Sequence, residues 1–386
     1  MINIPASIRQ DQKGFSQPEA RSILFLTTVN FSEPSGGVVY SRAIHDALAT
    51  QGKVTMAILS EHQRWTSRSI RWLFASVKSL FTGVPPNVLF HSGNLNLIGK
   101  NLIGRKWDLV VIDHLESAFS VAAKNSLVIY VSHNRESGLI RQKMPRAPSW
   151  CQRMLASWVE HYEQRLVRNV DAVIAISSDE ARWYRSLNSH VAVVPPVFSV
   201  PARLDSPANH EYLRLGFLGG AKWPPNLEAM DLLLAHVLPQ TRRPLELVIA
   251  GGGWDAAKIH HKLQGVGACS RINLKYLGYI DDIATFWSAI DVFAAPVASG
   301  AGVNVKVCEA LANACPVIAL PHALRGLDGI AKDLVCSVAT PDDFAHALDA
   351  FDATTYPRNA PDSLMPAQAA LKIEKLLATI SQSFSR

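Results

Sequence analysis

One segment, residues 296–320, combines the residue types that bind a phosphorylated ligand. It leads from an apolar run through Gly300 and Gly302 into a helical pattern. That pattern carries Lys306 and Glu309 near its start. Glycines let a ligand approach the backbone closely, and the first N–H groups of a helix attract an anion. An ammonium and a carboxylate three positions apart therefore suit a phosphorylated ligand that is rich in hydroxyl groups.

Other glycine clusters follow apolar runs elsewhere in the chain. Gly36 and Gly37 open a helical pattern after the run Ile23–Thr27, where they can approach a phosphate or simply form a turn. Comparable glycines in the second half of the chain are Gly219, Gly220, Gly251 and Gly252. Neither half contains the GxGxxG pattern, which argues against an ordinary dinucleotide oxidoreductase.

These residues must be positioned by strands, and short apolar runs alternate with amphipathic segments along the chain. The predicted strands of the first half are Ile23–Thr27, Val54–Leu59, Leu109–Ile112, Leu127–Val131, Ala172–Ile176 and Val191–Val194. Those of the second half are Leu213–Leu218, Leu245–Ala250, Leu274–Leu277, Val292–Ala295, Pro316–Leu320 and Leu334–Ser337. Continuous apolar runs are typical of strands buried in parallel sheets. The pattern predicts an α/β protein with two Rossmann-like, doubly wound parallel sheets.

The 386 residues exceed what one core usually supports, which favours two domains. The predicted divisions are a flexible N-terminal segment (1–21), an N-terminal domain (22–195), a linker (196–210), a C-terminal domain (211–360) and a C-terminal helix (361–386) that packs back on the N-terminal domain. Ligands of such sheets bind beyond the carboxyl ends of the strands. The chemistry is therefore expected in a cleft between the domains.

Composition and charge narrow the class of protein. Charged residues make up 18% of the chain, and the net charge of +6 favours partners that are acidic, such as nucleotide phosphates or anionic lipids. No nucleic-acid-binding signature is present, so nucleic acid is not expected as a partner. The five cysteines show no CxxC spacing, which argues against a disulfide framework or a zinc site. No signal-peptide core or membrane-spanning run is present, which predicts a cytoplasmic protein.

A set of further segments occurs in a fixed order along the chain. They are residues 132–136 (SHNRE), 175–180 (AISSDE), 215–229 (LGFLGGAKWPPNLEA), 247–253 (LVIAGGG), 276–282 (YLGYIDD), 287–296 (WSAIDVFAAP) and the glycine segment that follows. Taken together, this ordered set resembles the GT-B glycosyltransferases of family 4, also called group 1. The closest likeness is to bacterial exopolysaccharide and lipopolysaccharide sugar transferases.

The resemblance implies an activity and several site residues. The expected reaction is the transfer of a sugar, with retention of configuration, from a nucleotide-diphosphate sugar to a hydroxyl of a saccharide or lipid-linked acceptor. Glu309 matches the acidic residue that binds the ribose hydroxyls of the donor. The family's second glutamate is replaced here by Ala301, and its basic residues by Gly220 and Pro225.

Two lysines are available to stabilise the diphosphate that leaves, namely Lys306 and Lys222. His133 follows the run Leu127–Val131, at the position where the family has a histidine near the transferred sugar. His114, at the end of the preceding run, is a candidate for acceptor binding or for a general base, and equally for a helix cap. No Asp-x-Asp occurs in the chain, so neither a metal nor another cofactor is expected beside the nucleotide-sugar substrate.

Two basic and apolar segments raise the question of a membrane. Residues 64–81 form an amphipathic pattern with basic residues on one side and apolar residues on the other, and residues 141–153 are basic with apolar residues interleaved. Such a helix either lies on an anionic bilayer, at the inner face of the plasma membrane, or packs its apolar face on the first domain. The second segment favours the membrane.

Other activities fit part of the pattern. A nucleotide-sugar epimerase or hydrolase of the same fold would consume the donor without an acceptor. A non-catalytic scaffold that keeps the GT-B fold would bind no nucleotide sugar, and the alanine at position 301 keeps this alternative open.

Overall fold

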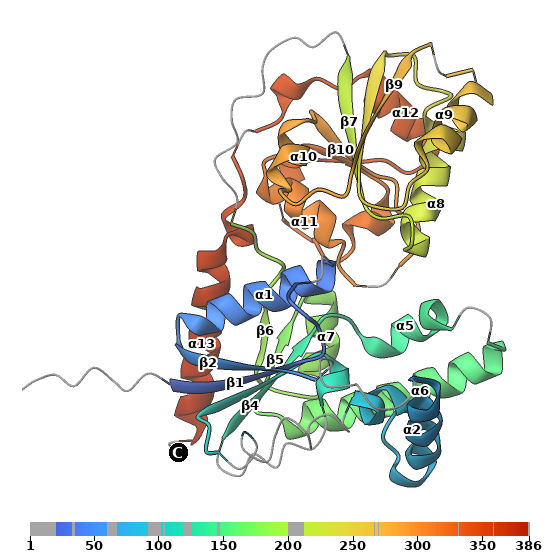
Figure 1. Ribbon diagram of the computed structural model, residues 1–386. Helices are drawn as coiled ribbons and strands as arrows, with labels where there is room; N and C mark the ends of the chain where they lie inside the picture. The colour runs from blue at the N-terminus through green and yellow to red at the C-terminus, as the bar shows by residue number, and fades with distance from the viewer. Residues whose placement is uncertain are drawn as a thin grey trace, which may run out of the picture.

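The computed structural model describes residues 21–32, 35–59, 68–91, 102, 105–118, 126–144, 147–199, 212–265, 267–268, 270–300, 302–330, 332–357 and 359–384. Among these residues, two six-stranded parallel sheets form, each with helices on its faces (Figure 1). The prediction of two Rossmann-like parallel sheets is therefore confirmed. The segment 1–20 and most of the predicted linker lie outside the described residues.

The N-terminal sheet has the strand order β2-β1-β3-β4-β5-β6. Its strands are β1 (Arg21–Thr27), β2 (Gly52–Ile58), β3 (Leu109–Asp113), β4 (Leu127–Ser132), β5 (Ala172–Ala175) and β6 (Val191–Val193). Its helices are α1 (Gly36–Ala49), α2 (Arg68–Thr82), α5 (Glu136–Lys143), α6 (Ser149–Asn169) and α7 (Ser178–Arg185). Every residue of β3 and β5 is buried, as expected of strands covered on both faces.

The C-terminal sheet has the strand order β12-β11-β10-β7-β8-β9. Its strands are β7 (Leu213–Leu218), β8 (Leu245–Ala250), β9 (Ile272–Gly278), β10 (Val292–Ala295), β11 (Val317–Ala319) and β12 (Val335–Ser337). Its helices are α8 (Pro224–Leu232), α9 (Ala256–Gly265), α10 (Ala284–Ser288), α11 (Val305–Ala312) and α12 (Pro341–Asp349). All twelve strands fall on the apolar runs of the sequence.

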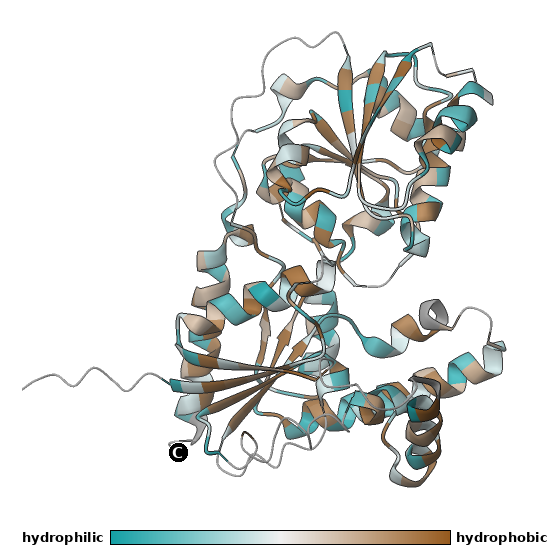
Figure 2. Ribbon diagram, in the orientation of Figure 1, coloured by the Kyte–Doolittle hydropathy of each residue, from teal (hydrophilic) through white to brown (hydrophobic). Residues whose placement is uncertain are grey.

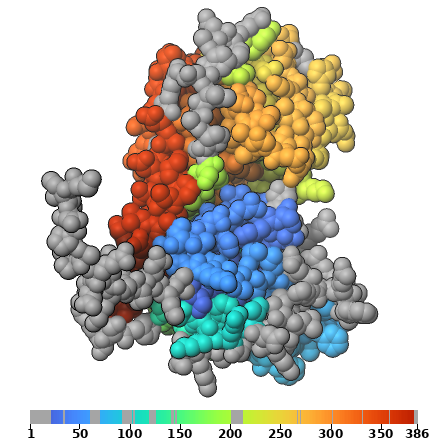
Figure 3. Space-filling model, turned by 60° about the vertical axis from the view of Figure 1, so that its left-hand side comes forward, coloured from blue at the N-terminus to red at the C-terminus, as the bar shows by residue number. Residues whose placement is uncertain are grey.

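The last helix, α13 (Pro366–Phe384), leaves the C-terminal domain and packs against α1 and β6 of the N-terminal domain. The space-filling view shows this C-terminal segment lying along both domains on one side of the molecule (Figure 3). One buried apolar cluster accordingly continues from Phe25 of β1 through Ile373 of α13 to Val307 of α11. Burial of such side chains contributes roughly 1.5–3 kcal/mol each. The two domains thus share part of their core.

The amphipathic helix α2 begins at Arg68, and residues 64–67 of the predicted segment lie outside the described residues. Two small side chains of this helix, Ala75 and Ser79, are buried, and Ala75 packs with Leu89 and Phe90. The large apolar side chains are exposed instead, with exposed fractions of 72% for Phe74 and 76% for Leu80. Figure 2 shows the hydrophobic residues along this helix in brown. The alternative in which the helix packs its apolar face on the first domain is therefore wrong. Within the described helices, none combines the length and the apolar character needed to cross a bilayer.

Candidate functional site

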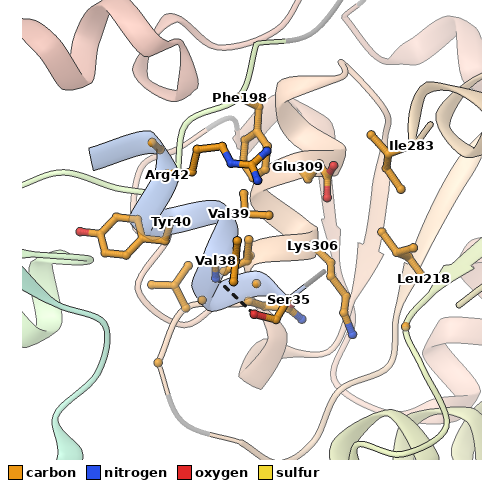
Figure 4. Close-up of a pocket in the computed structure, with 18 of the residues that line it drawn as sticks. Ser35, Val38, Val39, Tyr40, Arg42, Phe198, Leu218, Ile283, Lys306 and Glu309 are labelled. Carbon is orange, nitrogen blue, oxygen red and sulfur yellow. Dashed lines mark hydrogen bonds between the residues drawn. The ribbon is translucent and has the colours of Figure 1, made fainter. Parts of the chain in front are cut away.

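A cavity of about 1580 Å³ lies between the two domains and is lined from both sides (Figure 4). The residues singled out in the sequence that line it are Gly36, Gly37, His133, Gly219, Gly220, Lys222, Gly251, Gly252, Gly300, Gly302, Lys306 and Glu309. His114 is not among the lining residues and lies behind Gly37, whose added Cβ would be 3.9 Å from the ring. The fold therefore gathers glycine loops from both halves of the chain at one cleft.

The first turns of two helices meet across this cavity. Ser35 caps α1 by accepting a hydrogen bond of 3.2 Å from the amide of Val38. A Cβ built on Gly36, the next residue, would lie 3.4 Å from Val305, the first residue of α11. Helix N-termini carry partial positive charge, so two of them directed at one space favour an anion there.

Lys306 places an ammonium beside these helix ends. Its Nζ donates a 2.5 Å hydrogen bond to Oδ1 of Asn226, and Nδ2 of Asn226 donates to the carbonyl of Gly220 at 2.7 Å. Burial lowers the pKa of Lys306 to about 8, and the charge of Glu309 opposes this shift only in part. The cleft therefore contains a lysine held by a neutral amide rather than by a carboxylate.

Glycine is required where this lysine approaches the backbone. Gly219 has φ of 150°, and an added Cβ would lie 2.6 Å from Nζ of Lys306. Gly251 has φ of 126°, and its Cβ would lie 2.4 Å from the carbonyl oxygen of Gly219. A larger residue at either position would displace the lysine or separate the two loops.

Glu309 extends from the same helix into the cavity (Figure 4). Burial raises the pKa of its carboxyl to about 7, while the neighbouring Trp287 indole and the Lys306 charge lower it. Near neutral pH this group is thus poised between its two protonation states. As a carboxylate it can accept hydrogen bonds from two vicinal hydroxyl groups.

The N-terminal wall is organised by Asp113, which ends β3 and is fully buried. Its Oδ2 accepts hydrogen bonds of 2.7 Å from the hydroxyls of Thr27 and Ser41. Its Oδ1 accepts one of 2.7 Å from Nε2 of His133, the residue after β4. Because parallel strands end at the same edge of a sheet, Asp113 and His133 meet there and the carboxylate fixes the histidine ring.

His114 and Tyr40 complete this cluster. The rings of His114 and His133 stack with centroids 3.5 Å apart, and Tyr40 meets His133 edge-on at 4.7 Å. His114 has φ of 69°, in the left-handed region where residues other than glycine are uncommon. Burial and then the charge of His133 lower the pKa of His114, while the charge of Asp113 raises it.

The protonation of Asp113 follows from these contacts. Burial alone would raise its pKa, but the charges of His114 and His133 and the hydrogen bonds from His133 and Thr27 outweigh it. The resulting pKa is about 2. Asp113 is therefore an anion at every pH at which the protein is expected to work.

Among the described residues, one group could supply metal ligands, namely Asp113, His114 and His133. The donor atoms of Asp113 and His133 are already engaged: both carboxylate oxygens accept hydrogen bonds, and Nε2 of His133 donates one of them. The two imidazoles are stacked rather than converging on a point between them. This arrangement suits a hydrogen-bonded network better than a coordination site.

Some residues of the site were not singled out from the sequence. Asn226 lies inside the WPPN segment, and Asp113 directly follows the predicted strand Leu109–Ile112. The sequence did not indicate that Asn226 contacts Lys306 or that Asp113 contacts His133. Arg325 donates to two carbonyls of the glycine loop, at Gly300 and Gly302, and no pattern in the sequence indicates this contact.

The comparisons with known proteins agree with this architecture. A family model described as Glycosyltransferase Family 4 matches residues 34–199, and one described as Glycosyl transferases group 1 matches residues 213–351. A comparison with curated proteins gives no significant match.

Solved structures similar to this chain have the same two-domain fold. Sucrose-phosphate synthase from Thermosynechococcus elongatus is 18% identical with a TM-score of 0.61, over 95% of this chain and 98% of that one. The lipopolysaccharide outer core galactosyltransferase WaaB is 14% identical with a TM-score of 0.59, over 92% and 99%. HepE from Anabaena, solved with UDP and glucose, is 14% identical with a TM-score of 0.55, over 95% and 99%. At these identities the likeness establishes the GT-B fold.

Proposed function

Because the chain belongs to the GT-B glycosyltransferases of family 4 and group 1, we propose that it transfers a sugar from a nucleoside diphosphate sugar to an acceptor hydroxyl with retention of configuration. The observation that carries this proposal is the setting of Lys306. Its ammonium is held by Asn226 against the Gly219 loop, in a cleft lined by both domains, and its helix begins where the first turns of α1 and α11 meet. That setting suits the diphosphate of a donor.

The positions of the ribose and the sugar of the donor are inferred from the neighbouring residues. Glu309, from the same helix, is placed to accept hydrogen bonds from the two ribose hydroxyls. The transferred sugar then lies by the glycine loop at Gly302, opposite His133. The carbonyl oxygen of His133 faces this loop, 3.3 Å from the position of a Cβ on Gly302. Such a carbonyl dipole stabilises positive charge that develops on the reacting carbon.

In the proposed reaction, the bond between the sugar carbon and the diphosphate oxygen breaks as the acceptor oxygen bonds to the same face of that carbon. The leaving phosphate oxygen takes the acceptor proton. Lys306 and the helix termini stabilise the negative charge that the diphosphate gains, so this mechanism needs no metal ion. Asp113 holds the His133 ring in place and is not itself a base, because its pKa is about 2.

A thermal-shift screen with UDP-, GDP- and ADP-sugars tests the donor. UDP and UDP-glucose come first, because HepE was solved with each of them. We expect one donor to raise the melting temperature and Glu309→Ala to abolish most of that shift. An enzyme that consumes the donor equally fast without any acceptor would instead be an epimerase or hydrolase, and a chain that binds no nucleotide sugar would be a scaffold.

NMR of the first product formed tests the stereochemistry. The anomeric coupling of the transferred sugar should match that of the donor. An inverted product would instead assign base catalysis to the His133–Asp113 pair.

The exposed apolar face of α2 further supports the proposal that the protein binds an anionic membrane surface. There it would transfer the sugar to a lipid-linked acceptor of bacterial surface polysaccharide or glycolipid synthesis. Seven of the side chains of α2 are large, apolar and exposed: Ile70, Trp72, Leu73, Phe74, Val77, Leu80 and Phe81. Trp150 and Met154 add exposed apolar area on α6, and exposed Lys78 and Arg153 add positive charge. Such a face binds an interface by burying apolar side chains among the lipids.

A further inference from the structure

The glycine loop that faces the proposed sugar position is held from behind by two side chains. Nη1 of Arg325 donates to the carbonyl of Gly300 at 3.1 Å, and Nη2 donates to the carbonyl of Gly302 at 2.8 Å. Nε2 of His322 lies 3.1 Å from the same Gly300 oxygen. Because a carbonyl only accepts, His322 donates through Nε2 here.

These hydrogen bonds restrain a stretch of backbone whose glycines do not by themselves favour one conformation. Gly300 and Gly302 have φ of 128° and 72°, and glycine has many other conformations open to it. The planar guanidinium fork sets the distance and the direction of both carbonyls at once. Since C=O and N–H are antiparallel across a trans peptide, the amide of Val303 then points away from Arg325.

The same turn contacts the other domain. A Cβ on Gly326, the residue after Arg325, would lie 2.8 Å from Ser177 of the N-terminal domain and 2.9 Å from Val303 of the loop. A Cβ on Gly302 would lie 1.7 Å from Oδ1 of Asn134, also in the N-terminal domain. The loop is thus enclosed between the Arg325 turn and the first residues after β4 and β5.

We propose that Arg325 is a positioning residue for sugar transfer, which holds Gly300 and Gly302 in one conformation and, through Gly326, ties that conformation to contact between the domains. We call the two hydrogen bonds from Arg325 to Gly300 and Gly302 the clamp. The effect of the clamp on sugar transfer rests on the proposed function, but the clamp itself does not. Without Arg325 the loop samples other conformations, so the sugar loses its orientation while the nucleotide keeps its own contacts. A loss in kcat with little loss in nucleotide affinity is the expected signature.

Hydrogen exchange of the ligand-free full-length chain tests the clamp without any donor. The amides of Val307 and Cys308 donate to the Asn304 carbonyl, directly after the loop, and report on its order. We expect Arg325→Ala to speed their exchange by about tenfold. The matched control is Arg243→Ala, which removes an arginine that also donates to a backbone carbonyl of this domain, that of Phe351. It should leave these two amides unchanged.

Kinetics with the donor found in the screen test the catalytic consequence. Arg325→Ala should lower kcat by roughly 10- to 100-fold and change the dissociation constant of the matching nucleoside diphosphate by less than about twofold. The kcat of Arg325→Lys should lie between those of the wild type and Arg325→Ala, because an ammonium cannot hold two carbonyls as a planar guanidinium does. Arg243→Ala should keep the wild-type kcat.

The outcomes separate the two proposals. Unchanged exchange at Val307 and Cys308 in Arg325→Ala overturns the clamp, whatever the donor. Faster exchange with an unchanged kcat overturns the positioning role. A wild-type chain that binds no nucleotide sugar overturns the proposed function, while the exchange result still decides the clamp.

Discussion

Nζ of Lys306 and Oδ1 of Asn226, 80 residues apart in the chain, lie 2.5 Å apart in the cleft. The amide keeps the lysine near the Gly219 loop without neutralising it, so the positive charge stays available to a ligand. Replacing this amide by a carboxylate is therefore a sharp test of what the charge does.

Asn226→Asp should weaken binding of a nucleoside diphosphate by about tenfold or more, because the new carboxylate pairs with Lys306 and repels the phosphates. Isothermal titration with UDP and with uridine measures the effect and separates the phosphates from the base and ribose. Asn226→Ala removes the hydrogen bond without adding charge and should cost less. Equal affinities for UDP in the wild type and in Asn226→Asp would refute the phosphate role.

Binding of the diphosphate should also weaken at high pH. The pKa of Lys306 is about 8, so its charge is present at pH 7 and is lost as the pH rises through that value. Affinity for UDP should therefore fall between pH 7 and 9, approaching tenfold per pH unit above the pKa of the free protein. Lys306→Arg stays charged across this range and should show a flat profile. A wild-type profile as flat as that of the arginine variant would exclude Lys306 as the titrating group.

Glu309 should recognise the ribose hydroxyls. The wild type is expected to bind UDP about tenfold or more tightly than its 3′-deoxy analogue, because the carboxylate accepts a hydrogen bond from that hydroxyl. Glu309→Ala should bind the two ligands equally. Since the pKa of Glu309 is about 7, the wild-type preference should decline as the pH falls below 7. A variant that keeps the preference would place the ribose elsewhere.

Stability should depend on pH through Glu163, a fully buried residue of α6. Its Oε1 accepts hydrogen bonds from the hydroxyls of Tyr130 and Tyr184, at 3.2 and 2.7 Å. Burial raises the pKa of Glu163 from 4.5 to about 8. Because the pKa is higher in the folded than in the unfolded protein, the protonated carboxyl of Glu163 favours the folded state. This contribution to stability is complete below pH 4.5 and is lost as the pH rises through 8.

Urea unfolding at pH 6 and pH 8 measures this effect. The free energy of unfolding of the wild type should fall by on the order of 2 kcal/mol between them, about 1.4 kcal/mol per pH unit. Glu163→Gln cannot ionise and keeps an acceptor for both tyrosines, so its stability should change less over the same interval. Parallel pH profiles for the two proteins would contradict the assignment.

Vesicle binding should depend on the exposed face of α2. Sedimentation with vesicles that contain phosphatidylglycerol should retain the wild type at low salt, and Leu80→Asp should reduce binding about tenfold by placing a charge in the lipid interface. Leu371→Asp is the matched control, because Leu371 is also an exposed leucine but lies on α13, with an exposed fraction of 40%. Equal binding of both variants, or no wild-type binding at low salt, would remove the membrane proposal.

The strands and their grouping were predictable from the sequence, because a strand buried in a parallel sheet has a nearly continuous run of apolar residues. Leu245–Ala250 and Val292–Ala295 match β8 and β10 residue for residue. The outward direction of the α2 apolar face was not predictable. A helical wheel shows which residues share a side, but whether the domain covers that side depends on residues distant in sequence.

The cleft itself was predictable only as a location. Strand order places the ends of β3 and β4 together, yet the three hydrogen bonds on Asp113 depend on the rotamers of Thr27, Ser41 and His133. The sequence likewise predicted that Lys306 lies near the diphosphate. Its hydrogen bond to Asn226 was not predictable, because that contact depends on how α8 and α11 pack. Local patterns specify elements, whereas these contacts arise from the packing of elements.

The return of α13 to the N-terminal domain means that the polypeptide passes between the two domains twice. The amide of Phe198, before the first crossing, donates a 2.9 Å hydrogen bond to the carbonyl of Leu364, before α13. The two connections are thus joined and act as a hinge about which the domains can rotate, whereas sliding of one domain along the other would stretch both. Opening to exchange substrates should therefore be a pivot about the side where α13 lies. A chain cut ahead of Pro366 would lose that axis and also uncover the parts of α1 and β6 against which α13 packs.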